Sequence, residues 1–518
     1  MTSPGSDDPD RSQEAVFRFV ADPRTHGLSE PVKRVDTANA VVFLAGADVY
    51  KLKRAVKFPF MDLSTLDKRR DACEAEIAVN RPLAPAIYLA ALPIVRHGET
   101  FAIGGDGEVV EWAVHMRRFD ESATLDHVAN RDGVSDAIID KLALVIRRMH
   151  ARAPLRDAAR AAHALETYIE QNRAAFAERP DLFDPSTARK LTDDSRLAFA
   201  NVRPILLKRG EAGFVRRCHG DLHLRNIVLL EGQPTLFDAV EFSDEVATGD
   251  VLYDLAFLLM DLEERGLRAA ANRLFNHYLA SEPPEAFTGL LALPFFLSLR
   301  AAIRAKVEAA NAERLEGEKR KDARALARRY FDCAVHFLVA APPRIVAIGG
   351  LSGVGKSALA GALAPEIGRA PGALWLRSDV ERKVMFGVDE TVHLPAPAYA
   401  SDVTRDVYER LIAKARAALR AGQSVLVDAT FAAAAERGAV AGVATELGVP
   451  FAGLFLDAPL ATRLERIGSR EADASDADAD VARRQAAEPL SEKGWAAVAA
   501  SGSLSDTLAL ARSRLEGG

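Results

Sequence analysis

The apolar positions of the chain follow different patterns in different parts of its length. Short apolar runs bounded by turn residues predict strands in the first part. These runs lie at 40–44, 48–53, 87–95 and 111–117. Longer alanine-rich stretches with helical periodicity follow, at 135–173, 186–208 and 268–340. From residue 344 onward, buried-type strands alternate with helical segments, which predicts a parallel sheet covered on both faces.

Proline and polar segments divide the chain. Ala341-Pro342-Pro343 separates the helical stretch from the alternating one and is typical of a linker. The first 13 residues are polar and acidic, which is typical of a disordered tail. We therefore predict a tail at 1–13, a first domain at 14–340, a linker at 341–343 and a second domain at 344–518. This division also predicts that the two domains fold separately.

One loop carries the residue types of a phosphoryl-transfer site. His219-x-Asp221 is followed by Asn226, then by an apolar run, a turn and Asp238. Phosphoryl transfer needs a carboxylate that accepts the proton of the attacking hydroxyl, and oxygen ligands that hold Mg²⁺ against the phosphates. We assign the first role to Asp221 and the metal to Asn226 and Asp238. A zinc site at His219 and His223 is disfavoured, because Gly220 and the following strand argue against the helix of an H-E-x-x-H site.

This spacing matches H-R-D-x-x-x-x-N followed by D-F-G in protein kinases, with Gly220 in place of the arginine. The segment resembles the aminoglycoside phosphotransferase and choline kinase branch, in which H-G-D-x-x-x-x-N is the usual form. The resemblance implies that the 40–53 hairpin covers the nucleotide and carries a phosphate-binding lysine. Strand alternation puts Lys51 and Lys53 on one face, and we favour Lys51 because it ends an apolar run. Glu76, on a helix predicted over 67–83, is its expected partner.

A second phosphate-binding motif follows the linker. The sequence G-x-x-x-x-G-K-S stands between a buried strand and a helix, which is the context of a P-loop. Its backbone amides would hold the phosphates, its lysine would contact the β- and γ-phosphates, and its serine would ligate Mg²⁺. The residues concerned are Gly350, Ser352, Gly353, Val354, Gly355, Lys356 and Ser357.

The segment from Arg344 onward resembles small P-loop kinases of the gluconate kinase, zeta-toxin and polynucleotide kinase group. The resemblance implies that Asp379 is the acceptor-side base and Arg382 an anion clamp, in a D-x-x-R pattern; a helix-capping Asp379 is the alternative. Asp428 ends a buried strand and is a candidate carboxylate near Mg²⁺. Arg466 and Arg470 precede a lid-like acidic segment and would neutralise transition-state charge, unless they are surface arginines at a helix end.

The composition and net charge of the chain argue against some classes of protein. The chain has 518 residues, 49% hydrophobic and 27% charged, with a net charge of −6. These values describe a folded globular protein and argue against a polyanion-binding role for the whole molecule. Its three cysteines are far apart in sequence and indicate reduced thiols. Neither a signal peptide nor an apolar run of membrane-spanning length is present, so we expect a cytoplasmic protein that does not enter a membrane.

Together the two parts resemble bifunctional aminoglycoside phosphotransferase/ATP-binding proteins, from about residue 34 to the end of the chain. The resemblance implies an α+β bilobal protein-kinase-like fold followed by an α/β P-loop NTPase fold. It also implies an ATP- and Mg²⁺-dependent phosphotransferase acting on hydroxyl groups of small molecules. Two alternatives stay open. One is a single kinase regulated by a nucleotide-sensing P-loop ATPase domain, and the other is a C-terminal polynucleotide-end kinase. The acidic balance and the lack of a basic stripe argue against nucleic acid. The sequence gives no oligomeric state.

Overall fold

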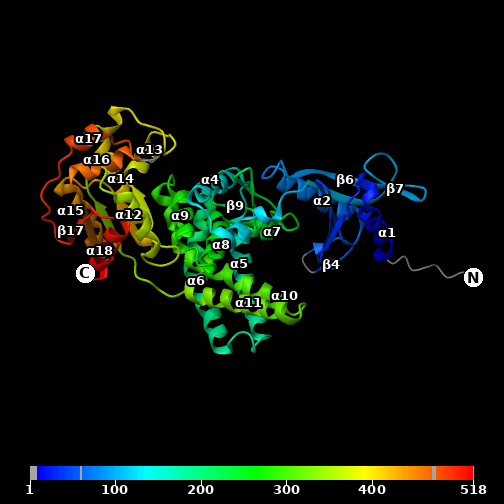
Figure 1. Cartoon of the computed structure of the whole chain (residues 1–518). Coiled ribbons are helices and arrows are strands. Elements are labelled where there is room, and N and C mark those ends of the chain that lie inside the picture. Colours follow the sequence, from blue (N-terminus) through cyan, green and yellow to red (C-terminus); the bar gives the residue numbers. More distant parts are fainter. Residues whose placement is uncertain (1–8, 59–60, 470–473, 517–518) are drawn as a thin grey trace, which may run out of the picture. The chain divides into compact units, whose positions relative to one another are not determined.

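The computed structural model describes residues 9–58, 61–469 and 474–516. It divides into two compact units. The first comprises residues up to Val134 together with Arg148–Ala164 and Gly213–Asp254, and the second comprises the remainder. Each unit is described by itself, with its elements labelled as in Figure 1.

The first unit is built on an antiparallel sheet with the strand order β1-β2-β3-β8-β6-β7. The strands are β1 (Lys33–Asp36), β2 (Ala40–Ala45), β3 (Asp48–Lys53), β6 (Tyr88–His97), β7 (Thr100–Ile103) and β8 (Glu108–Arg117). The apolar pattern predicted β2, β3, β6 and β8. It did not predict β1, because all four residues of this edge strand are exposed and leave no alternation of apolar and polar positions.

Two helices accompany this sheet. In α1 (Pro9–Ala21), the residues Val16, Phe17 and Val20 are buried against β2, β3 and β8. The predicted tail ended at Gln13, whereas the helix begins at Pro9, and Gln13 itself is buried and donates to Glu111 Oε2 at 2.7 Å. The tail boundary was therefore wrong for 9–13, and residues 1–8 lie outside the described residues. The helix α2 (Leu66–Asn80) packs through Cys73 against Tyr88 and Val114.

The remaining elements of the first unit include the hairpin of the predicted catalytic segment, β10 (Ile227–Leu230) and β11 (Gln233–Leu236), which pair in antiparallel register. A second short pair joins β9 (Val215–Arg217) to β12 (Thr248–Asp250). The others are η1 (Pro23–His26), β4 (Lys57–Phe58), β5 (Met61–Asp62), η2 (Glu121–Ala123), α3 (Leu125–Asp132), η3 (Leu224–Asn226) and α7 (Asp244–Ala247).

The second unit begins with a helical layer. Its elements are α6 (Pro185–Glu211), α9 (Arg268–Leu279), η4 (Pro284–Leu291), α10 (Leu293–Ala312) and α11 (Gly317–Phe337), while α4 (Asp136–Arg152), α5 (Ala158–Ala177) and α8 (Val251–Glu264) have residues in both units. No single helix among the described residues is long and apolar enough to cross a membrane, and η4 with α10 passes that test only as a bent pair.

The rest of the second unit is an α/β layer around a parallel sheet with the order β14-β15-β13-β16-β17. The strands are β13 (Ile345–Gly349), β14 (Leu374–Arg377), β15 (Val425–Asp428), β16 (Phe451–Asp457) and β17 (Trp495–Ala499). All five residues of β13 are buried, as expected for a central parallel strand. The prediction of a parallel sheet in this half is confirmed.

Helices connect the strands of the parallel sheet. They are α12 (Lys356–Leu363), η5 (Ala364–Glu366), α13 (Ser378–Met385), η6 (Ala396–Tyr399), α14 (Ser401–Arg420), α15 (Ala434–Leu447), α16 (Leu460–Gly468), α17 (Ala479–Arg484) and α18 (Leu504–Glu516). A core of β13 and α12 residues with Leu454, Val498 and Ala511 fills the space between the sheet and one helix layer.

Candidate active sites

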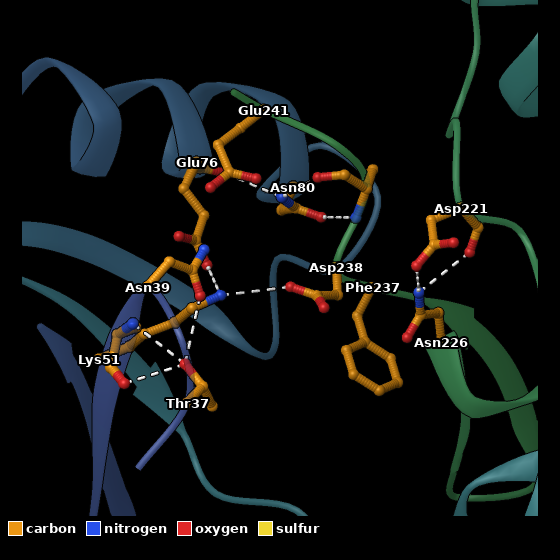
Figure 2. A network of polar contacts seen from close by, with 12 residues as sticks. Thr37, Asn39, Lys51, Glu76, Asn80, Asp221, Asn226, Phe237, Asp238 and Glu241 are labelled. Carbon is orange, nitrogen blue, oxygen red and sulfur yellow. Dashed lines mark hydrogen bonds and ion pairs between the residues drawn. The ribbon is translucent and has the colours of Figure 1, made fainter. Parts of the chain in front are cut away.

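The two strand lysines of the first unit share one buried glutamate. Lys51 Nζ lies 2.8 Å from Glu76 Oε1 and 3.3 Å from Asp238 Oδ1, whereas Lys53 Nζ lies 2.5 Å from Glu76 Oε2 and 2.6 Å from Glu241. The side chain of Lys53 is 1% exposed and that of Lys51 is 18% exposed. Lys53 is thus enclosed by carboxylates, and Lys51 is the lysine that faces Asp238 (Figure 2).

Attraction between opposite charges keeps Glu76 and Lys51 in their charged forms. Burial opposes the ionisation of Glu76, but the ammonium groups of Lys51 and Lys53 outweigh burial and lower its pKa. Burial likewise opposes the charge of Lys51, but Asp238 and Glu76 raise its pKa well above the usual value. Each charge therefore depends on its neighbours, as in a buried ion pair.

Helix α2 also fixes the segment after β11 that carries Asp238. The side chain of Asn80, one turn after Glu76, accepts from Ala239 N at 2.7 Å and donates to Ala239 O at 3.1 Å. Asp238 has a left-handed backbone with φ of 59°, which is uncommon for a residue other than glycine and is often found at functional sites. Its N–H donates to the Tyr88 hydroxyl at 3.2 Å.

The hairpin brings Asp221 and Asn226 opposite Asp238. Asn226 Nδ2 donates to Asp221 Oδ2 and to the Asp221 carbonyl, each at 3.0 Å. The Asp221 and Asp238 side chains are 42% and 48% exposed, so both carboxylates are open to a ligand. Figure 2 shows Asp238 between Lys51 on one side and the Asp221–Asn226 pair on the other. The structure brings together all four residues.

The loop that presents Asp221 is held from beneath by Asp254. The buried Asp254 carboxylate accepts from the backbone N–H groups of His219, at 3.2 Å, and Gly220, at 2.9 Å, and lies 3.1 Å from His150 Nε2. Gly220 has φ of 84°, and a Cβ there would come within 3.2 Å of Val240 and Ala247. The loop geometry therefore requires glycine, where protein kinases have arginine.

His219 ties the loop to the segment before Asp238. Its Nε2 lies 3.0 Å from the Phe237 carbonyl, and burial lowers its pKa, so we assign it as a neutral ring donating this bond. Among the described residues, the group with a geometry suited to a metal is His150, Cys218 and Asp254, which excludes both His219 and His223. The zinc interpretation of His219 and His223 is not supported.

A turn that the sequence reasoning missed lies next to the lysine end of β3. β1 and β2 are joined across Thr37 and Asn39, and the Asn39 carbonyl accepts from Arg54 N at 2.8 Å. The Gly46 turn, which was expected to cover the nucleotide, lies at the opposite end of β3, where Asp48 pairs with Arg117. The β1–β2 turn therefore lies beside the lysine end of β3, and the Gly46 turn does not; β1 was not predicted from the sequence.

The P-loop of the second unit joins β13 to α12. Gly350, Gly353 and Gly355 have φ of 140°, 82° and 102°. A Cβ at Gly350 would lie 2.8 Å from the Leu456 carbonyl, and one at Gly353 would lie 2.5 Å from the Arg463 carbonyl, so the loop lies against the backbone. The loop leads directly into the N-terminus of α12, a position that suits phosphate.

The serine of the P-loop meets the predicted carboxylate. Ser357 Oγ donates to Asp428 Oδ2 at 2.8 Å, where Asp428 ends β15. Burial raises the pKa of Asp428, and the nearby Lys356 and Arg377 oppose that shift. Arg377 Nε is 4.0 Å from Asp428 Oδ2, and its guanidinium lies over the Trp375 ring. Arg377 was not predicted, although its place at the end of β14, before Asp379, could have indicated it.

Arg382 and Asp379, the two residues of the predicted D-x-x-R pattern, lie in different surroundings. Arg382 is 5% exposed, donates to the Ala398 carbonyl at 2.7 Å and lies over the Tyr399 ring, so it is not placed as an anion clamp. Asp379 lies inside the first turn of α13, for which Arg377 is the N-cap residue, so it does not cap the helix. The i,i+3 spacing from Asp379 predicted that Arg382 lies at the site, but its guanidinium donates hydrogen bonds to residues of the 396–404 segment instead.

Arginines and a glutamine hold the P-loop from the side of α16. Arg466 donates to the Val354 carbonyl at 2.9 Å and to the Gly502 carbonyl, so it lies beside the P-loop, and its role in neutralising transition-state charge stays a prediction. Arg463 donates to the Ser352 carbonyl at 2.9 Å. Gln485 accepts from Ser352 N at 2.8 Å and donates to Ser352 Oγ. Arg463 and Gln485 carry no motif that the sequence could have shown, and Arg470 lies outside the described residues.

Comparison with known proteins gives two family matches. Residues 39–289 match the model of the phosphotransferase enzyme family, and residues 345–489 match that of an AAA domain. Uncharacterized proteins of Mycobacterium tuberculosis and Mycobacterium bovis are each 29% identical over 459 residues, which cover 87% of this chain and 89% of the relative.

Solved structures are similar to each half. A gluconokinase from Sinorhizobium meliloti is 21% identical, with 35% of this chain and 94% of that chain covered and a TM-score of 0.25. A choline/ethanolamine kinase family protein from Mesorhizobium loti is 14% identical, with 63% and 98% covered and a TM-score of 0.36. The family models thus match a phosphotransferase-family domain followed by an AAA domain.

Proposed function

Because the chain joins a phosphotransferase-family domain to a P-loop kinase-like domain, we propose that it has two phosphotransfer centres. Each would bind Mg-ATP and transfer the γ-phosphoryl group to a hydroxyl of a small molecule. The observation that carries the proposal is the position of Asp238, between the ion-paired Lys51 and the Asp221–Asn226 pair. Among the described residues, Cys73, Cys218 and Cys333 form no disulfide, which suits the cytoplasm, where ATP is available.

The donor set of the first centre fits Mg²⁺. This ion takes oxygen ligands, and Asp238 offers a half-exposed carboxylate. The amide nitrogen of Asn226 is bonded to Asp221, which leaves its Oδ1 as the atom suited to a metal. Bound Mg²⁺ would neutralise charge on the β- and γ-phosphates. In the second centre Ser357 and Asp428 fit the same ion, because their oxygens already meet at 2.8 Å.

The side chains of the first centre have separate tasks. Lys51 would place a positive charge against the phosphates, and Glu76 holds that ammonium in position at 2.8 Å. Asp221 would orient the acceptor hydroxyl and take its proton as the new O–P bond forms. Asp254 keeps the loop under Asp221 in place through the N–H groups of His219 and Gly220.

In the second centre the P-loop amides and Lys356 would hold the phosphates, and Asp379 would act as the acceptor-side base. Arg377, rather than Arg382, is the arginine within reach of Asp428, so we assign it the task of stabilising charge there. Arg382 is buried and donates to the Ala398 carbonyl, which weakens the argument from the D-x-x-R pattern for a polynucleotide-end kinase. This centre therefore has a small-molecule acceptor in our proposal.

A nucleotide-sensing role for the P-loop domain is the second candidate. It is favoured by Arg382 and Arg466, because both predicted charge-stabilising arginines bond to backbone carbonyls instead. A sensor needs Lys356 but not Asp379, whereas a kinase needs both. Asp379 therefore separates the two functions.

The test pairs ATP binding with phosphoryl transfer in an Asp379→Asn variant of the full chain. This change keeps the side-chain size and removes the base. We expect ATP affinity near that of the wild type, measured by calorimetry, and a fall in transfer by the second centre of at least roughly tenfold. Full transfer in the variant would remove Asp379 from the mechanism. Wild-type binding without transfer to any acceptor would favour the sensor.

A further inference from the structure

Helix α9 of the phosphotransferase-family half covers the open edge of the parallel sheet. β14 is the edge strand, and the Asn276 side chain accepts from Trp375 N at 2.6 Å. The amides of Asn272 and Asn276 both donate to the Ala373 carbonyl, at 3.0 and 3.2 Å. These buried side chains occupy the backbone groups that another strand would otherwise pair with. α9 is thus a structural part of the P-loop domain.

The same helix forms one wall of a cavity, here called the α9 cavity. Its volume is about 370 Å³, and its other walls come from α12, β14, α13 and α14. Arg273 and His277 line it on the α9 side. Ser357 and Arg377 also line it, and these are the residues that contact Asp428. The cavity therefore reaches from α9 to the predicted metal-binding serine, and its volume is typical of small-molecule sites.

The charges that line the α9 cavity balance one another. Among the described residues, its lining cations are Arg273, Arg377 and Lys414, and its lining carboxylates are Asp136, Glu381 and Glu390. Arg273 lies 2.6 Å from Asp140, which is outside the lining, and 2.9 Å from Asp136, and Lys414 lies 2.6 Å from Glu381. Arg377 faces Asp428. Burial lowers the pKa of His277, so at neutral pH its ring offers one donor and one acceptor.

Balanced charge favours a neutral ligand, because a charged one would enter a site with no net opposite charge to compensate its desolvation. Hydroxyl groups both donate and accept hydrogen bonds, so they match a lining in which guanidinium donors alternate with carboxylate acceptors. The Trp375 ring adds an apolar face.

We propose that the α9 cavity is the acceptor site of the P-loop centre and takes a neutral polyhydroxylated small molecule. This inference rests on the proposed kinase function of that centre. In the sequence Asp379 stands between Arg377 and Val380, both of which line the cavity, while Asp379 itself is not among the lining residues. An acceptor oxygen would form a bond to the γ-phosphorus as the bond to the β–γ bridging oxygen breaks. ADP leaves with that electron pair, and the hydroxyl proton passes to Asp379. The phosphotransferase-family half thus supplies a wall of the second centre.

The test fills the cavity from the α9 side. Ala269 lines the cavity and is exposed, whereas the next residue, Ala270, does not line it. Ala269→Phe and Ala270→Phe are therefore matched variants on one helix. Both are made in full-length Asp221→Ala protein, so that the first centre is silent. Transfer from labelled ATP is measured with neutral hexoses and polyols, with sugar acids as an anionic set and amino alcohols as a cationic set.

We expect a neutral polyol or sugar to be phosphorylated. Ala269→Phe should raise the acceptor KM at least roughly tenfold with ATP affinity unchanged, and Ala270→Phe should leave KM within about twofold. A preferred sugar acid or amino alcohol would overturn the ligand class. An unchanged KM in Ala269→Phe would show that α9 does not form a wall of the acceptor site, and would leave the kinase function intact. Absence of transfer in the parent protein, with ATP bound, would overturn the kinase function and this inference with it.

Discussion

Lys51 and Lys53 are two residues apart and share Glu76, yet their surroundings give them different tasks. Lys53 is enclosed by Glu76 and Glu241, whereas Lys51 is partly exposed beside Asp238. A buried carboxylate that loses its cation is destabilising, since its charge is then uncompensated. The two lysines should therefore respond differently to the same substitution.

Lys53→Met should lower the free energy of unfolding by roughly 3–5 kcal/mol, the usual cost of breaking a buried ion pair. Lys51→Met should cost less stability, because Lys53 still neutralises Glu76, but it should weaken ATP binding by the first centre. Urea unfolding and calorimetry on both variants check this. Equal loss of stability together with unchanged ATP binding in Lys51→Met would show that Lys51 is not the phosphate-binding lysine.

Gly220 and Gly232 both have positive φ, at 84° and 73°, but only Gly220 is crowded. An alanine in this left-handed region costs roughly 1–2 kcal/mol by itself. Gly232→Ala should show that cost alone. Gly220→Ala should be roughly 1–3 kcal/mol worse, because its methyl group meets Val240 and Ala247, and crowding of a packed site adds strain. Urea unfolding of both variants tests this, and equal losses would mean that the loop beside Asp221 is not sterically constrained.

At the scale of single residues, the sequence indicated the residues whose spacing is fixed by the chemistry of phosphoryl transfer. Asp221, Asn226, Asp238 and Ser357 with Asp428 lie in the expected groupings, although their roles remain proposals. It did not indicate the hydrogen-bond partners of Arg382 and Arg466, because a long side chain can reach several partners and sequence spacing does not choose among them. The backbone carbonyls that accept from them belong to other segments, 16 residues away for Arg382 and 112 residues away for Arg466.

At the scale of elements, the predictable parts were those with an apolar face. The parallel sheet after residue 344 was predicted, because the continuous apolar runs of its buried strands are strong signals. β1 has four exposed residues and gave no such signal, so the turn beside the lysine end of β3 was not predicted. The role of α9 could not be predicted, since Asn272 and Asn276 bond to a strand about a hundred residues away.

Asn276→Leu tests that role of α9. It keeps a similar volume and removes both the acceptor of Trp375 N–H and a donor to the Ala373 carbonyl. Each buried polar group left without a partner costs roughly 1–3 kcal/mol, so we expect a loss in that range or somewhat above it. Asn311→Leu, at an exposed position on α10, should change stability by less than about 0.5 kcal/mol. Urea unfolding of the full chain measures both, and equal effects would mean that α9 does not stabilise β14.

At the scale of the whole molecule, the linker predicted at 341–343 lies between α11 and β13 and belongs to neither element. We predicted that the two halves fold separately, but α9 of the first half makes hydrogen bonds to the second half. Arg268 donates to the Pro365 and Gly368 carbonyls, and Asn272 and Asn276 cover the edge of β14. A fragment that begins at Pro342 loses all of these contacts.

We expect such a 342–518 fragment to bind Mg-ATP, since its P-loop is complete. Its urea midpoint should be lower than that of the full chain, and it should self-associate, because the uncovered β14 edge can pair with another copy. Sedimentation and urea unfolding check this. A monomeric fragment with a midpoint as high as that of the full chain would show that the α9 contacts contribute nothing.

The central claim is that one chain holds two phosphotransfer centres. It is tested most directly by transfer from labelled ATP to a metabolite library, with the wild type, Asp221→Ala and Lys356→Ala measured side by side. We predict two acceptor sets, one reduced roughly 10²–10⁴-fold in Asp221→Ala, the usual effect of losing a positioned base, and the other lost only in Lys356→Ala. If Lys356→Ala abolishes ATP binding by the P-loop domain and leaves every acceptor phosphorylated at the wild-type rate, the second centre is not a kinase.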